Sequence, residues 1–94
     1  MIVRILGEGQ YDVDDAQADL LNALDTGLEQ AVEAGNDQSF RAALSDLLAK
    51  VRSVGSKLPD ESLEPSDAVL PGEDSSIDEV RALLSESDEG LIPG

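Results

Sequence analysis

The chain has 94 residues and a formal net charge of −15, because 21 acidic side chains face only six basic ones. Such a charge repels nucleic-acid phosphates and anionic lipid surfaces, which argues against direct binding to either. The absence of histidine and cysteine excludes imidazole catalysis, thiolate nucleophiles, disulfides and the usual structural zinc site. We therefore expect one small domain whose core is built from aliphatic side chains.

The first predicted element is a β-hairpin over residues 1–13. Residues 1–6 are rich in β-branched side chains and too short for a helix, and residues 10–13 alternate in character. The Gly-Glu-Gly segment at 7–9 supplies the positive φ angles that a tight turn needs. A phosphate-binding loop is the alternative for Gly-x-Gly, but here a strand-like segment follows instead of a helix N-terminus.

An antiparallel helical hairpin is predicted over residues 14–54, because apolar side chains recur at helical spacing in both of its halves. The predicted inward stripes are Leu20, Leu21, Leu24, Leu28, Ala31 and Val32 in the first half, and Phe40, Ala43, Leu44, Leu47, Leu48, Val51 and Val54 in the second. Gly35 can end the first helix in the left-handed conformation, and Asn36 or Asp37 can cap the second. So short a connection makes the two helices antiparallel.

The densest acidic cluster consists of Asp12, Asp14, Asp15 and Asp19 and could suggest a calcium or magnesium site. Its spacing does not fit an EF-hand loop, which needs oxygen ligands at alternate positions, a central glycine and a terminal glutamate. Helix capping explains the cluster better, since Asp14 followed by Gln17 has the form of a capping box. We therefore expect no metal ligand, no catalytic carboxylate pair and no cofactor-binding residue.

The acids of the first helix are the candidate functional residues. Residues 14–34 hold six acids and no base, whereas residues 37–54 hold three bases and two acids. A solvated face that keeps a small protein soluble is the simplest interpretation. The alternative is a docking face for a basic partner, and its candidate residues are Asp19, Asp25, Glu29 and Glu33.

The C-terminal part is predicted to be a loop followed by a short helix. Residues 55–75 contain three prolines and many acids, which indicates an ordered wrap or a tether, and residues 67–70 could add a short third strand. A capping-box sequence, Ser-Ile-Asp-Glu, opens a short helix over residues 76–86, and residues 87–94 form a tail. The apolar face of this helix consists of Ile77, Val80, Leu83 and Leu84. We expect it to dock on its own domain, with a partner-dependent arm as the alternative.

Four segments of the chain carry a resemblance to a known family. They are MIVRILGEGQY at 1–11, AVEAG leading to FRAAL at 31–44, LPD leading to PSDAVLP at 58–71, and EVRALL leading to GLIPG at 79–94. In this order they resemble the PspA-associated protein family of actinobacteria. The resemblance covers essentially the whole chain and brings no catalytic or cofactor residue. It implies a small cytoplasmic partner of phage-shock protein A, the membrane-associated coiled-coil protein of the envelope-stress response.

The sequence thus predicts an α+β protein in the order β-β-α-α, a loop with a short third strand, and a last helix. No apolar run approaches 18 residues and no signal peptide is present, so we expect a cytoplasmic protein that could be recruited to the inner face of the membrane through its partner. We expect a non-enzymatic protein. An acidic inhibitor or antitoxin-like protein that masks a basic nucleic-acid-binding surface is the alternative.

Two ways of binding phage-shock protein A follow from these predictions. An exposed edge of the N-terminal hairpin could accept a strand, or the helical hairpin could lay its faces against a coiled coil. The helical mode is favoured, because by resemblance the partner is almost entirely helical and offers no strand.

Overall fold

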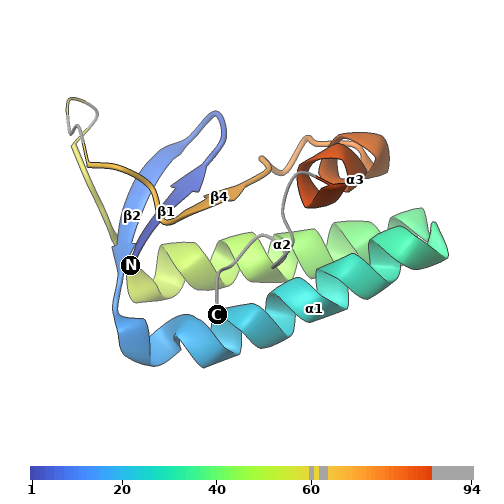
Figure 1. The fold of residues 1–94 in the computed structure, drawn as a ribbon, viewed down its shortest axis with the longest axis horizontal. Helices are drawn as coiled ribbons and strands as arrows, with labels where there is room; N and C mark the ends of the chain where they lie inside the picture. The colour runs from blue at the N-terminus through green and yellow to red at the C-terminus, as the bar shows by residue number, and fades with distance from the viewer. Residues whose placement is uncertain (60, 62–63, 86–94) are drawn as a thin grey trace.

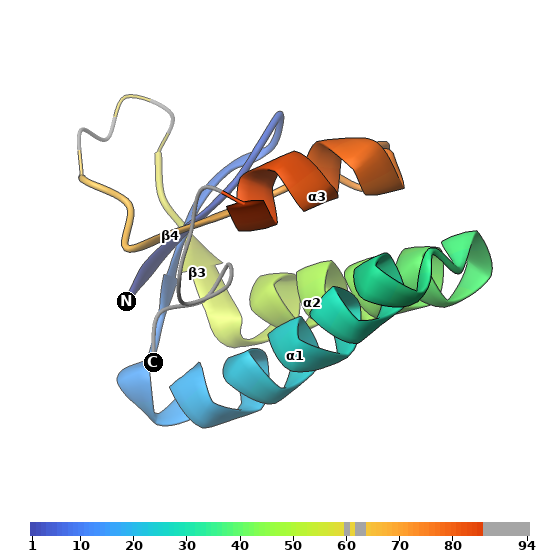
Figure 2. The ribbon, with the colours of Figure 1, turned by 45° about the vertical axis from the view of Figure 1, so that its right-hand side comes forward.

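A computed structural model of the chain describes residues 1–59, 61 and 64–85. Its elements are, in chain order, β1 (Ile2–Ile5), β2 (Gly9–Val13), the short 3-10 helix η1 (Asp15–Gln17), α1 (Ala18–Ala34), α2 (Asp37–Val54), β3 (Gly55–Lys57), β4 (Ala68–Leu70) and α3 (Ile77–Ser85). The α1–α2 hairpin forms one layer, and the sheet and α3 lie side by side over it as the second (Figures 1 and 2). The predicted α+β fold class is confirmed.

Local chemistry sets the connection between the two long helices as predicted. Gly35 ends α1 in the left-handed conformation, with φ of 69°, and its N–H is donated back to the last turn. The Asn36 side chain accepts the Ser39 N–H at 3.0 Å and so caps α2. At the other end of α1 the helix proper begins only at Ala18, because Asp14 caps the preceding 3-10 turn by accepting the Ala16 N–H at 3.0 Å.

The sheet has the strand order β3-β2-β1-β4. β1 and β2 form the predicted antiparallel hairpin; the turn contains Gly7 at φ of 82°, and Gly9, the first residue of β2, has φ of 137°. The predicted third strand is present as β4, which pairs parallel to β1 with Ala68 opposite Val3. β3 was expected to be loop, and that prediction is wrong.

β3 forms because the chain leaves α2 already extended. Gly55 has φ of −96° and ψ of 160°, and its N–H still bonds to the Val51 carbonyl. A Cβ at Gly55 would lie only 2.7 Å from that carbonyl oxygen, so the close approach of helix and strand requires a glycine. The next residues then pair antiparallel with β2, where Lys57 lies opposite Tyr11.

One apolar core lies between the two layers. It is built from alternate residues of the strands, the inner faces of α1 and α2, and one residue of α3. Its fully buried large side chains are Phe40, Ile5, Leu21, Leu28, Leu44, Leu47, Leu48, Leu70, Val3, Val13 and Val51. Almost every buried side chain is thus aliphatic, as the composition predicts.

The buried stripe of α1 is rotated relative to the predicted one. Leu20 is 41 % exposed and Leu24 is only half-buried, whereas Asp25 is 3 % exposed. Assigning Leu20 to the inward stripe was therefore wrong. The buried residues of α1 lie on the side from which this helix contacts α2 and α3, and Leu20 lies outside that arc, on the open side of the helical hairpin.

α3 docks on its own domain, as expected. Val80 is fully buried, and an Arg81 Nη donates to the Val32 carbonyl of α1 at 3.1 Å. The Ser76 hydroxyl accepts the Glu79 N–H at 3.2 Å, which is half of the predicted capping box. The predicted last residue of this helix, at 86, and the predicted tail over 87–94 lie outside the described residues.

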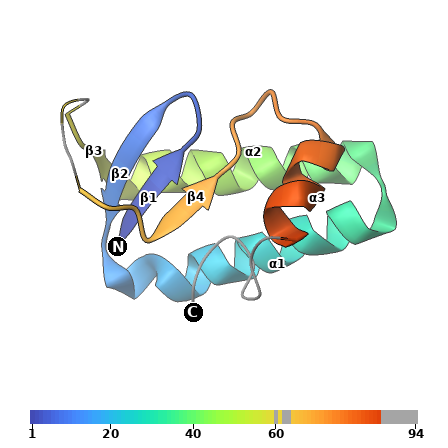
Figure 3. The same cartoon turned by 45° about the horizontal axis from the view of Figure 1, so that its top comes forward.

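The face of the sheet opposite the helices is partly covered by the approach to β4. The Gln10 side chain points to this face and is 5 % exposed. Its Nε2 donates to the Glu64 carbonyl at 2.6 Å and to the Ser66 hydroxyl at 2.9 Å. Residues 64–67 therefore cross the sheet as an ordered wrap, which Figure 3 shows in front of β2.

Candidate partner-binding surface

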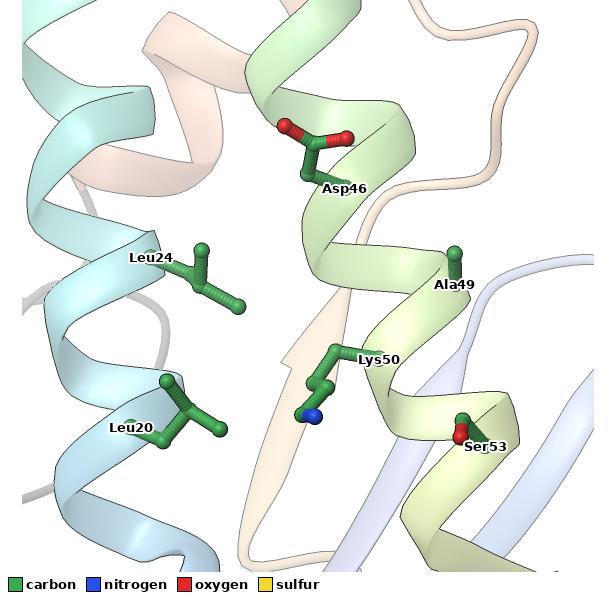
Figure 4. Close-up of a pocket in the computed structure, with 6 residues that line it drawn as sticks. All are labelled: Leu20, Leu24, Asp46, Ala49, Lys50 and Ser53. Carbon is green, nitrogen blue, oxygen red and sulfur yellow. The ribbon is translucent and has the colours of Figure 1, made fainter.

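An open groove runs between α1 and α2 on the side of the helical hairpin away from the sheet. It has a volume of about 460 Å³. Its walls are Leu20 and Leu24 from α1 and Asp46, Ala49, Lys50 and Ser53 from α2. In Figure 4 both leucines point toward α2, with the strands and α3 behind the helix pair. We call this surface the outer groove.

Small side chains extend the outer groove along both helices. Ala23 and Gly27 of α1 and Ala42 and Ala49 of α2 are all exposed. Positions 20, 23 and 27 repeat at steps of three and four, and so do positions 42, 46, 49 and 53, so each set lies on one side of its helix. A further helix could approach this side closely at these small residues.

Asp46 and Lys50 are the two charged residues of the outer groove. Their spacing of four residues on α2 would allow an ion pair across one helical turn. However, neither residue forms an ion pair with any part of the chain that the structure describes. Both charges are therefore available to a second molecule.

The four acids predicted to bind a partner do not lie in the outer groove. Asp19 and Glu33 are exposed, Glu29 is half-buried and Asp25 is buried. Burial of the Glu29 carboxyl, together with repulsion from Asp25 and Glu33, raises its pKa. Asp25, Glu29 and Glu33 therefore lie close together on the edge of α1 that faces away from the groove. A partner can reach Asp19, Glu29 and Glu33 directly, whereas Asp25 belongs to the interior.

A polar network that the sequence did not indicate lies at the end of α2. Arg52 donates from Nη2 to Glu8 Oε1 at 2.7 Å, from Nε to Glu8 Oε2 at 2.9 Å, and from Nη1 to Glu73 Oε1 at 2.8 Å. The Tyr11 hydroxyl donates to Glu8 Oε2 at 2.6 Å. These bonds lower the pKa of Glu8 to about 2, the bond from Arg52 having the largest effect, and the bond to Glu8 raises the pKa of Tyr11.

This network is a structural connection and not a binding site for an anion. A hollow of about 310 Å³ lies beside it, but the side chains around it include Glu8, Glu73 and Asp74, and the one cation, Arg52, is already held by two carboxylates. The network joins the β1–β2 turn, the last turn of α2 and the connection from β4 to α3. Local patterns could not reveal it, because Arg52 and Glu8 are 44 residues apart.

Two further kinds of feature are absent from the described part of the chain. It contains no group of three or more acidic, histidine or cysteine side chains placed to hold a metal ion. Among the same residues, no helix combines the length and the apolar character that crossing a membrane requires.

The sequence matches a family model described as PspA-associated protein over residues 1–94. The chain belongs to this family. The resemblance seen in the sequence is therefore confirmed over the full 94 residues, and the family's description records an association with PspA. No curated protein and no solved structure gives a significant match.

Proposed function

We propose that the protein is a non-enzymatic binding partner of PspA, phage-shock protein A, in the bacterial envelope-stress response. Family membership supports the choice of partner. The composition supports a binding role, because the chain lacks the histidine and cysteine side chains that most often carry catalysis. The net charge of −15 supports an indirect relation to the membrane, in which the chain reaches an anionic lipid surface through its partner.

The sheet topology is the observation that favours a helical mode of binding. β1 is hydrogen-bonded to β2 on one side and to β4 on the other, and β2 lies between β1 and β3. Neither strand of the N-terminal hairpin therefore has a free edge, and a partner strand cannot be added to it. Of the two binding modes predicted from the sequence, this favours contact through the α1–α2 hairpin, whose inner side is occupied by the core and whose outer side is open.

The proposal is tested by recovering the tagged protein from its own cells together with whatever is bound to it. We expect PspA to copurify, and the purified pair to form a complex in a direct measurement such as isothermal titration calorimetry. The control is the destabilised variant Leu47→Ala, which carries the same tag and the same acidic charge. Proteins that this variant also recovers are bound nonspecifically. Recovery of a basic nuclease or DNA-binding factor in place of PspA would favour the acidic-inhibitor function instead.

A further inference from the structure

We propose that the outer groove is the docking site for one α-helix of the partner, a helix with an apolar stripe that is flanked mainly by basic residues and by one acidic residue facing Lys50. This inference rests on the proposed function and adds where on the chain the contact is made and what chemistry the bound helix carries. The acidic edge of α1 faces away from the groove and therefore lies outside the contact.

The apolar part of the argument starts from Leu20 and Leu24. Leu20 is 41 % exposed although the core accepts most other large aliphatic side chains of α1. Together with Leu24 it forms an apolar strip along one wall of the groove (Figure 4), and exposed Ala49 of α2 also lines the groove. An amphipathic helix that anchors its side chains at helical spacing fits such a strip, and the small residues permit interaxial distances of about 8 to 10 Å.

The charges of the groove fix the direction in which that helix lies. Asp46 and Lys50 are one turn apart and are not paired within the described chain. A helix that presents a basic residue to Asp46 and an acidic residue one turn away to Lys50 satisfies both in one orientation only. Reversing the helix places like charges opposite each other, which is unfavourable.

The net charge decides between a different protein and a second copy of this chain. Two copies would bring together two molecules of charge −15, and their mutual repulsion opposes association. A partner helix with basic residues along its flanks is attracted by the same field. We therefore assign the groove to a partner of opposite local charge and not to a homodimer.

The first experiment measures the affinity of the full chain for purified PspA after adding a charge at one exposed apolar residue. Leu20→Glu places a carboxylate in the groove, and Val69→Glu does the same at a comparably exposed residue, 37 %, on β4. We expect Leu20→Glu to weaken binding at least about tenfold and Val69→Glu to change it less than about twofold. Thermal melts of both variants check that the fold is retained.

The second experiment tests the direction of the helix without changing the net charge. The double variant Asp46→Lys with Lys50→Asp exchanges the two charges of the groove. Exchanging Asp37 and Arg41, an exposed ion pair with the same spacing on the same helix outside the groove, is the matched control. We expect the first exchange to weaken binding by about tenfold and the second to have little effect.

The outcomes separate this inference from the proposed function. If wild-type protein binds PspA and both groove variants bind equally well, the groove is not the site, and the proposed function stands. If the wild-type protein shows no affinity for PspA, the proposed function is wrong, and the inference that rests on it is wrong as well. If sedimentation of the chain alone shows a dimer that Leu20→Glu dissociates, the occupant is a second copy and the assignment to a partner helix is overturned.

Discussion

Arg52 and Glu8 form a bidentate ion pair across 44 residues of sequence, with Nη2 to Oε1 at 2.7 Å and Nε to Oε2 at 2.9 Å. Their side chains are 32 % and 28 % exposed, so the pair is shielded from much of the solvent. It fastens the β1–β2 turn to the last turn of α2, and the second bond from Arg52 to Glu73 adds the connection toward α3. The Arg52 guanidinium thus connects three segments that are distant in sequence.

We predict that this pair contributes measurably to stability. Arg52→Gln and Glu8→Gln should each lower the free energy of unfolding by about 1 to 2 kcal/mol, because each leaves a half-buried charge without its partner. In a double-mutant cycle the combined variant should lose less than the sum of the two single losses. The control is Arg41→Gln, which removes a more exposed pair with Asp37 and should cost less than about 0.5 kcal/mol. Additive losses in chemical denaturation would show that the pair is not coupled.

The same pair predicts a dependence of stability on pH. The pKa of Glu8 is about 2 in the folded protein, below its usual 4.5. A depressed pKa means that this contribution is fully present above pH 4.5 and is lost as pH falls through about 2. The stability difference between wild type and Glu8→Gln should therefore shrink over this interval. A difference that stays constant in denaturant titrations from pH 6 to about pH 2 would contradict the assigned pKa.

We predict that alanine substitution lowers the free energy of unfolding more at Leu47 than at Leu24. Leu47 is fully buried in α2, so Leu47→Ala should lower the free energy of unfolding by roughly 2 to 5 kcal/mol. Leu24 is half-buried at the outer groove, so Leu24→Ala should cost clearly less, about 1 kcal/mol. Thermal melts of the two variants measure this difference. Equal losses would mean that Leu24 belongs to the core after all.

The docking of α3 predicts that Val80 is a core residue of the isolated protein. Val80→Ala should lower the free energy of unfolding by roughly 1 to 3 kcal/mol, because Val80 is fully buried between α3 and the rest of the domain. Val69→Ala makes the same chemical change at an exposed site of β4 and should cost less than about 0.5 kcal/mol. If the two variants melt alike without a partner present, α3 does not stabilise the isolated domain.

Features that depend on neighbouring residues were predictable from the sequence. Helical spacing of apolar residues predicts α1 and α2, and the left-handed Gly35 followed by the Asn36 cap predicts their connection. The glycines at 7 and 9 predict the first hairpin in the same way. In each case the physical cause acts over a few residues, as a steric limit on φ or a hydrogen bond from a side chain to the next turn.

Features that depend on packing between distant segments were decided only by the tertiary structure. Residues 55–57 become a strand because β2 offers them a free edge, and the sequence Gly-Ser-Lys carries no pattern that indicates it. The positions of α2 and α3 decide which side of α1 is buried, and for this reason Asp25 is buried and Leu20 is exposed. The outer groove and the Arg52–Glu8 pair have the same origin, since both require helices or turns that the sequence alone does not place side by side.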